Sequence, residues 1–306
     1  ALPVGNGRLG AMVFGKTDEE RIQFNEETYW SGGPYSQTVK GGYKALPEIQ
    51  KLIFEGNHIK AHKMFGRNLM GYPVEQQKYQ SLGDLILRFP PGGEVKNYRF
   101  ELDLDTAVAR VSYEQGDMHF VREIFSSAID QVIVVSLKAD KPANISFVAN
   151  LRGCRNEAHS NSATDYSRMD GYGKDGVILR GKSADYMGVE GKLRYQARLK
   201  VIPEGGSMSV DDTDLIVKNA DRVTLYLAAA TNFINYKDVS GDPNQRVEAV
   251  LKGLEGKSYE EIKAAHIEEY KRFFRRVSID LGSTPNSFLP TDERLQKFDG
   301  NNDPNL

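Results

Sequence analysis

Apolar and polar residues alternate along much of the chain between residues 85 and 231, which is the pattern of strands with one buried face. In the clearest run, the apolar positions are Leu193, Tyr195, Ala197, Leu199 and Val201, and the polar residues between them are Arg194, Gln196, Arg198 and Lys200. Side chains of a strand point alternately to the two faces of a sheet, so one face of this strand is expected to be dry and the other wet. Residues 100–104 and 107–113 repeat the pattern.

Two further segments, residues 132–137 and 223–230, are almost continuously apolar and are expected to lie between packed layers. Clusters of Gly, Pro and Asp separate the predicted strands at residues 91–93, 116–117, 205–206 and 211–212. Such clusters are typical of the short turns that join antiparallel strands. We therefore predict a mainly β fold built from two antiparallel sheets.

Helical periodicity is confined to a few segments. The first, residues 46–56, begins near Pro47 and carries on one face Leu46, Ile49 and Ile53. The second follows at once and carries Ala61, Phe65 and Leu69. Both are predicted to form an insertion between strands, because each is flanked by Gly-rich or Pro-containing sequence.

Two more helices are predicted after the last strand, and each has a clear start. Asp242 is expected to cap the first, with Pro243 at its first position and Gly253 at its end. Ser258 and Glu261 have the spacing of a capping box at the start of the second. Its apolar flank, expected to be buried, consists of Tyr259, Ile262, His266, Tyr270 and Phe273. A short helix is predicted over residues 291–298.

Charge and composition narrow the classes of partner. The chain has 306 residues, of which 40% are hydrophobic, so it can bury a sizeable core. Its 40 basic and 42 acidic residues leave a net charge of −2, which gives no reason to expect nucleic acid or an anionic membrane as partner. No stretch approaches the roughly 20 apolar residues that span a bilayer. The chain is expected to be soluble and to act on a neutral substrate.

The residues that most often bind metals or form covalent intermediates are sparse. Cys154 is the only cysteine, which excludes an internal disulfide, and its thiol is expected to be inert. His58 and His62 lie four residues apart on a predicted helix, but Ile59 stands where a metalloprotease has its general-base Glu. We therefore predict a solvated helix face there and no metal. His266 is expected to be a hydrogen-bonded core residue.

Gly5, Gly7 and Gly10 match the G-x-G-x-x-G spacing of dinucleotide-binding loops. That loop needs a preceding strand and a following helix, whereas residues 11–15 have the composition of a strand. A β turn that leaves Asn6 and Arg8 exposed is predicted instead. No nucleotide cofactor is expected.

Glycoside hydrolysis usually requires two carboxyl groups, about 5 Å apart for retention or roughly 6.5–9.5 Å apart for inversion. From the residues alone, the candidates are Glu26, Glu27 and Asp84, because they lie beside glycine-rich and aromatic segments. The many other acidic residues leave this choice open.

Seven blocks of sequence carry a family resemblance: GNGRLGAMVFG (5–15), FNEETYWSGGP (24–34), YQSLGDL (79–85), YRFELDLDTA (98–107), REIFSS (122–127), the segment 228–243, and RVSIDLG (276–282). In this order they resemble the amino-terminal β domain of glycoside hydrolase family 95, the α-L-fucosidases. No block aligns within residues 153–176.

The resemblance implies a large two-sheet β super-sandwich with a short helical insertion and a C-terminal linker helix. It divides the chain into the super-sandwich (1–255), the linker helix with a following strand (256–282), and the start of the segment leading to a catalytic helical barrel (283–306). The barrel itself is expected to lie beyond this chain, which is also expected to be trimmed at its front.

The same resemblance places the catalytic acid Glu, and the Asp and Asn residues that activate water, in the absent barrel. It therefore implies no catalytic residue and no cofactor in this chain, and it argues against Glu26, Glu27 and Asp84 as catalysts. The parent enzyme is expected to remove terminal α-L-fucose from fucosylated glycans with inversion, or L-galactose as the alternative. The barrel is the expected partner, and a bacterial, secreted or periplasmic protein is implied.

Seven residues are candidates for sugar contact or for the interface with the barrel: Asn6, Arg8, Asn25, Glu26, Tyr29, Trp30 and Tyr35. The aromatic ones offer an apolar face to the C–H side of a pyranose. Alternatively, Trp30 packs at the junction with the barrel, where Asn25 and Glu26 hydrogen-bond across it. A free-standing carbohydrate-binding module is thus the alternative function, and a scaffold that only docks the barrel is a third.

Overall fold

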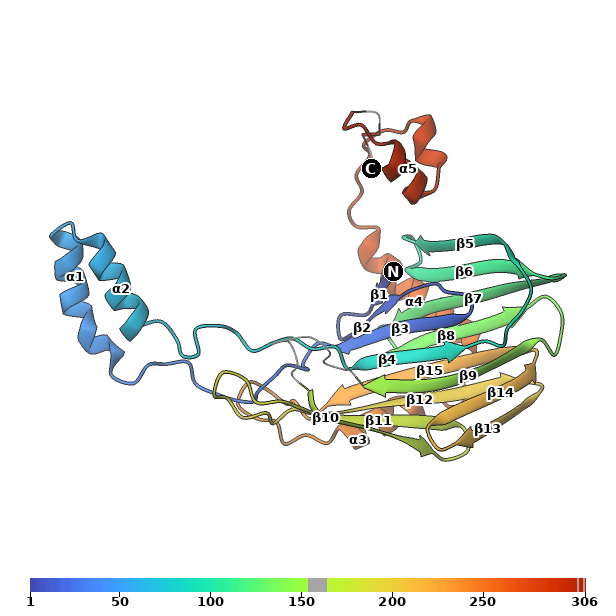
Figure 1. Ribbon diagram of the computed structural model, residues 1–306, viewed down its shortest axis with the longest axis horizontal. Coiled ribbons are helices and arrows are strands. Elements are labelled where there is room, and N and C mark those ends of the chain that lie inside the picture. The colour runs from blue at the N-terminus through green and yellow to red at the C-terminus, as the bar shows by residue number, and fades with distance from the viewer. Residues whose placement is uncertain (154–163, 302, 305) are drawn as a thin grey trace.

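The computed structural model describes residues 1–153, 164–301, 303–304 and 306. Cys154 and His159 lie outside the described residues. In the described part of the chain, two antiparallel sheets of seven and eight strands pack face to face, which confirms the predicted mainly β fold (Figure 1). Helices lie on the outside of this sandwich or project from it.

The seven-stranded sheet is formed, in spatial order, by β1 (Leu2–Gly5), β2 (Leu9–Val13), β3 (Glu19–Glu26), β4 (Gly83–Arg88), β9 (Ile145–Gly153), β14 (Asp214–Ala220) and β13 (Ser207–Asp211). The eight-stranded sheet is formed by β10 (Thr164–Tyr172), β11 (Gly176–Ser183), β12 (Arg194–Glu204), β15 (Arg222–Thr231), β8 (Val132–Ala139), β7 (Met118–Ser127), β6 (Val108–Gln115) and β5 (Val95–Asp103). All four predicted turn clusters lie between consecutive strands.

The main core fills the space between the two sheets, and the alternation in the sequence accounts for it. On β8, Ile133 and Val135 point into this core, while Val132 and Val134 point outward into a second apolar cluster beneath the helices. β8 and β15 are therefore covered on both faces, as their continuous apolar composition predicts. Gly15 has φ +79° and lies against the ring of Phe100, where a Cβ would come within 2.7 Å of the ring.

The prediction of a wet face on β12 is correct for Arg194, which is exposed, and in part for Lys200, which is half-buried, but it is wrong between them. Its inner face is buried as expected, but Gln196 and Arg198 on the other face are only 3% and 2% exposed. They are covered by α3 (Pro243–Lys252), where Arg198 donates to Asn244 and also to Glu248 at 3.3 Å. Hydrogen bonding and ion pairing make this burial tolerable, because a buried cation without partners is costly.

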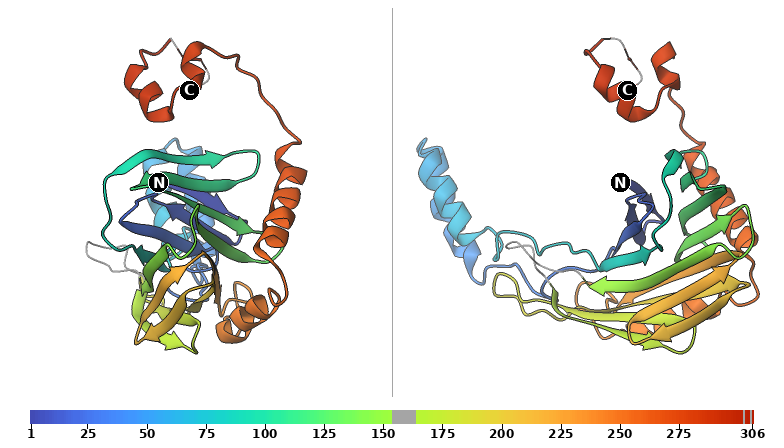
Figure 2. Two further views of the ribbon diagram at one scale, coloured as in Figure 1. Left: turned by 90° about the vertical axis from the view of Figure 1, so that its right-hand side faces the viewer. Right: turned by 45° about the vertical axis from the view of Figure 1, so that its right-hand side comes forward.

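Helix α4 (Tyr259–Phe274) packs against the outer face of the eight-stranded sheet (Figure 2). The predicted capping box of Ser258 and Glu261 is present. The buried flank is shorter than predicted: His266 is 3% exposed, but Phe273 in the last turn is 51% exposed. The His266 ring stacks on Phe125 with centroids 4.7 Å apart, and its Nε2 lies 3.0 Å from the carbonyl oxygen of Thr106.

His266 should make stability depend on pH. Burial lowers the pKa of His266 below its ordinary value, Lys263 adds to the lowering, and the carbonyl of Thr106 opposes it. The native state therefore resists protonation, so the stability is present above about pH 6.5 and is lost as pH falls through the lowered pKa. We expect the free energy of unfolding to fall by up to ~1.4 kcal/mol per pH unit in that range.

Urea unfolding between about pH 7.5 and 5.5 measures this dependence. His266→Gln should flatten the slope, whereas His119→Gln, a change at an incompletely buried strand position, should leave it unchanged. An unchanged slope in His266→Gln would contradict the assignment.

Between β3 and β4 the chain projects from the sandwich as an arm, residues 31–82, which ends in α1 (Leu46–Phe54) and α2 (His58–Asn68) (Figure 1). A short helix, η1 (Gly42–Ala45), precedes α1. The predicted insertion is thus present, but its buried face differs. Ile49 and Leu52 are buried, whereas Ile53 is 46% exposed, since only the partner helix is available to cover α1.

His58 and His62 lie exposed on α2, as a solvated helix face requires. Within the described residues, no group of three His, Cys, Asp or Glu side chains could hold a metal ion. No helix in the same residues is long and apolar enough to cross a membrane.

The chain after α4 differs from the expectation of a strand near residues 276–282. Residues 277–284 belong to no helix or strand, and Val277 and Ile279 are 84% and 80% exposed. No strand edge of the described residues runs beside them, so the alternation has no ladder to join. The short helices η2 (Pro285–Phe288) and α5 (Thr291–Lys297) follow, the latter where a helix was predicted.

Candidate functional site

A groove of about 420 Å³ lies at the end of the sandwich where the arm leaves it. Four stretches of chain meet there: residues 28–37 where the chain enters the arm, residues 76–77 at the end of the arm, Leu193 just before β12, and the loop that follows β15. The lining consists of Thr28, Trp30, Ser31, Gly33, Pro34, Tyr35, Gln37, Gln76, Gln77, Leu193, Phe233, Asn235, Tyr236 and Val239. We call this the aromatic groove. Its volume falls in the range of about 300–1,000 Å³ typical of small-molecule sites.

Hydrogen bonds hold the wall that contains Trp30 in place. The indole Nε1 of Trp30 donates to the carbonyl oxygen of Glu27 at 2.9 Å, and the ring lies 5.2 Å from that of Tyr79. Ser31 Oγ donates to Gln77 Oε1 at 3.0 Å and accepts from the amide of Lys78 at 2.8 Å. These contacts join the segment that enters the arm to the segment that returns from it, so the wall is preformed.

Gly32 is required in this wall for steric reasons. It adopts φ +66°, and a Cβ at this position would lie 2.6 Å from Gln77 Oε1 and 2.9 Å from Val189. The Gly32 carbonyl accepts from Ser183 Oγ and from the amide of Lys192, both at 2.9 Å. A larger residue would push the outgoing strand away from the eight-stranded sheet and open the groove.

The described residues that line the aromatic groove present apolar rings and amides but no acidic or basic side chain. Trp30 and Tyr35 are each 36% exposed, and Tyr236 is 73% exposed. Gln77 is 9% exposed at the groove floor, and its Nε2 is buried without a hydrogen-bond partner. This combination suits an uncharged ligand with both apolar and hydroxyl surfaces.

Tyr29 does not belong to the groove, although the sequence suggested it as a sugar contact. It is completely buried and packs edge-on against Tyr195, with ring centroids 4.7 Å apart. β3 buries its even-numbered residues, and the turn at residues 27–28 shifts this alternation, so that Tyr29 lies in the core and Trp30 at the surface.

The other candidates form a separate cluster between the sheets. The turn predicted at residues 5–10 is present, with Asn6 N donating to Leu9 O at 2.9 Å, but Asn6 and Arg8 are half-buried instead of exposed. Asn6 Nδ2 donates to the carbonyl oxygen of Ser127 at the end of β7 at 2.9 Å, and Arg8 donates to Gln131 in the turn that follows. Both side chains therefore join the two sheets.

Glu26 is 4% exposed and has structural partners. Its carboxylate lies 3.5 Å from Arg8 Nη1 and accepts from both the amide and the hydroxyl of Thr28. Asp84 is paired with Arg21 at 2.9 Å, and Glu27 is exposed. Asn25, next to Glu26 on β3, is half-buried. None of the three acidic candidates lines the aromatic groove.

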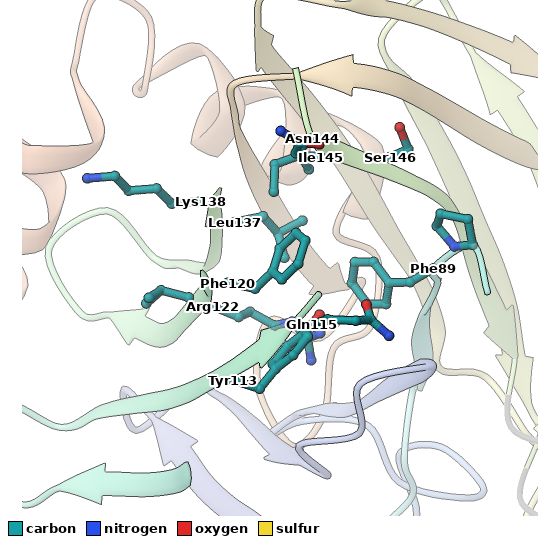
Figure 3. A pocket seen from close by; sticks show the side chains of 12 residues that line it. Phe89, Tyr113, Gln115, Phe120, Arg122, Leu137, Lys138, Asn144, Ile145 and Ser146 are labelled. Carbon is teal, nitrogen blue, oxygen red and sulfur yellow. The ribbon is translucent and has the colours of Figure 1, made fainter. Parts of the chain in front are cut away.

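A second, much smaller cavity of about 50 Å³ lies between the sheets near Arg122 (Figure 3). The rings of Tyr113 and Phe120 stack there at 5.2 Å, and the guanidinium of Arg122 lies over Phe89 at 4.8 Å. The volume is well below the roughly 300 Å³ of the smallest usual ligand sites. This cavity lies at the margin of the sandwich, beside the buried ion pair of Arg122 and Glu20, and no ligand is assigned to it.

The sequence analysis did not identify Gln76, Gln77, Asn235 and Tyr236. These residues lie far along the chain from the segments 5–15 and 24–34, which supplied most of the candidates. Tyr236 and Asn235 lie within residues 228–243, one of the blocks that carry the family resemblance. That block was a usable signal for the loop. Gln76 and Gln77 have no local pattern that marks them, because only the return of the arm brings them to Trp30.

Comparison with known proteins gives the family. Residues 1–236 match the family described as glycosyl hydrolase family 65, N-terminal domain, and residues 258–306 match the glycosyl hydrolase family 95 catalytic domain. "Alpha-L-fucosidase 2" of Arabidopsis thaliana is 33% identical over 100% of this chain, which covers 38% of that relative. "Probable alpha-fucosidase A" of Aspergillus niger is 29% identical over 99% of the chain, which covers 39% of it.

Among solved structures, the "Putative kojibiose phosphorylase from human microbiome" aligns with a TM-score of 0.51 at 10% identity, over 89% of this chain and 35% of that one. At that identity the likeness supports the fold alone. The chain thus spans about two fifths of the length of the curated relatives it matches. By the match over residues 1–236, the chain belongs to the glycosyl hydrolase family 65 N-terminal domain family, and residues 258–306 add a segment that matches the family 95 catalytic domain.

Proposed function

We propose that this chain is the amino-terminal part of an α-L-fucosidase that hydrolyses terminal α-L-fucosyl linkages with inversion. The observation that carries the proposal is the alignment of the whole chain with "Alpha-L-fucosidase 2" at 33% identity. L-Galactose is the alternative sugar, because it differs from L-fucose only by a hydroxyl group. A secreted or periplasmic location belongs to the same proposal.

Within that enzyme, the β domain is proposed to be non-catalytic. Hydrolysis of a glycosidic bond needs a pair of carboxyl groups facing the sugar. No carboxyl group is found among the described residues that line the aromatic groove, and Glu26 and Asp84 are held in ion pairs with Arg8 and Arg21. The chemistry is therefore assigned to the family 95 catalytic domain, of which residues 258–306 are the first part.

The β domain is proposed to hold that catalytic domain in place. The arm carries exposed apolar residues far from the sandwich: Phe54 is 88% exposed, Ile59 75% and Tyr72 72%. Val277 and Ile279 are equally exposed where the chain enters the catalytic segment. Both regions project from the sandwich (Figures 1 and 2). Apolar surface of this extent usually marks an interface, and the family 95 domain is the proposed occupant.

Fucose release separates the proposed parts. We expect the longer protein encoded by the gene to release L-fucose from fucosyllactose, and the purified 306-residue chain to release none. Glu26→Gln in the longer protein should keep the turnover number, because Glu26 has a structural role. Enzyme-dependent release of fucose by the 306-residue chain, or a reading frame that ends at codon 306, would refute the proposal.

A further inference from the structure

We propose that the aromatic groove is a binding site for an uncharged saccharide. The inference deepens the proposed function, on which it rests for the choice of a fucosylated probe. It concerns binding to the β domain and no step of the reaction. Binding and fucose release are measured separately, so one proposal can fail while the other stands.

The first argument is the placement of three exposed aromatic side chains around one hollow. Trp30 and Tyr35 come from residues 28–37, where the chain enters the arm, and Tyr236 comes from the loop after β15. Each leaves a large part of its surface in water, as their exposed fractions of 36%, 36% and 73% show. Rings held in this way supply the apolar contact area that the C–H face of a sugar needs, at little entropic cost.

The second argument is a buried amide group in the same lining that lacks a hydrogen-bond partner. Gln77 Oε1 accepts from Ser31 Oγ at 3.0 Å, but Gln77 Nε2 is buried and has no partner. An unpaired buried donor costs roughly 1–3 kcal/mol, so a partner is expected in the functional state. A turn of the amide toward the groove would present Nε2 to a saccharide hydroxyl. Gln76 and Asn235 add further amide groups to the same lining.

The third argument is the absence of charge. The described lining of the groove contains no Asp, Glu, Lys, Arg or His, whereas two other hollows of the surface are strongly charged. One of these is lined by Lys182, Glu190, Lys192, Arg194 and Asp242, and the other by Arg110, Glu123, Asp140, Arg222, Glu260 and Lys263. An acidic sugar or a phosphate would gain nothing in the aromatic groove, so a neutral saccharide is the matching class.

The groove contains its own reporter, because Trp30 is the only tryptophan of the chain. We expect fucosyllactose, titrated into the 306-residue chain, to shift Trp30 emission to the blue and to protect it from acrylamide quenching. Lactose tests whether the fucosyl residue or the rest of the glycan is bound. Binding of an uncharged ligand should be the same at low and high salt, since salt screens only charged contacts.

Tyr236→Ala tests the contact directly, because this side chain is too exposed for its loss to unfold the sandwich. We expect it to weaken binding about tenfold, a typical cost of removing an aromatic contact residue. The matched control is Tyr43→Ala on the arm, a tyrosine that is 68% exposed and outside the groove, which should leave affinity unchanged. The proposal is overturned if neither fucosyllactose nor lactose changes the fluorescence of Trp30. Equal affinity of Tyr236→Ala and the unmodified chain overturns it as well.

Discussion

Arg122→Met lowers the free energy of unfolding by about 3–5 kcal/mol, since it leaves the carboxylate of Glu20 buried without its cation. Glu20 on β3 and Arg122 on β7 are 0% and 2% exposed and form an ion pair that joins the two sheets. Burial raises the pKa of Glu20, while Arg122 and the amides of Gly15 and Phe14 oppose the rise. Removing Arg122 removes the largest of those opposing contributions.

Urea unfolding of matched variants measures the effect. Arg88→Met is the control, because Arg88 bonds Glu19 at 2.9 Å between neighbouring strands but is 38% exposed, so a loss below about 1 kcal/mol is expected. Glu20→Gln combined with Arg122→Met should recover part of the stability, because no buried charge then remains. If Arg122→Met costs no more than Arg88→Met, the pair does not stabilise the sandwich in the way proposed.

Arg8→Met is expected to cost roughly 2–3 kcal/mol, because it removes several hydrogen bonds and the cation beside Glu26. Arg8 donates to Gln131 Oε1 at 2.6 Å and to the carbonyl oxygens of Ala229 and Gln131 at 2.7 and 3.1 Å. Burial lowers the pKa of Arg8, and Glu26 opposes that shift. The guanidinium therefore bonds the first turn of the seven-stranded sheet to β15 and to the turn between β7 and β8 of the other sheet.

The matched control is Arg180→Met, because Arg180 pairs with Asp170 at 2.9 Å but its side chain is 46% exposed. A loss below about 1 kcal/mol is expected there. Thermal unfolding of both variants distinguishes the cases. A normal stability in Arg8→Met together with impaired fucose release in the longer protein would favour a functional role for this cluster over the structural one.

The alternation in the sequence was sufficient to predict two antiparallel sheets, because burial on a strand repeats every second residue. It was insufficient to predict what covers each outer face. Gln196 and Arg198 have the composition of a wet face, yet α3 buries them by supplying Asn244 and Glu248 as partners. A polar residue in a strand has the same local pattern whether it meets water or a helix.

The candidate site was predicted only in part, and the reason is again one of distance along the chain. The motif around Trp30 indicated one wall of the groove, but the opposite wall comes from Tyr236, about two hundred residues later in the sequence. The motif also grouped Arg8 and Glu26 with Trp30, although those two side chains point into the space between sheets. The turn at residues 27–28 ends the pattern of β3 between Glu26 and Trp30, so closeness in sequence did not bring their side chains together.

Because the arm leaves from β3 and returns to β4, two neighbouring antiparallel strands, its tip is attached to the molecule as a long hairpin. The pairing of Glu19 with Arg88 through Phe24 with Gly83 sets the alignment of these strands without any contribution from α1 or α2. Evolution can therefore lengthen, shorten or exchange that tip while the sheets keep their register. The same junction offers protein engineers a place to graft a different recognition element onto an unchanged β scaffold.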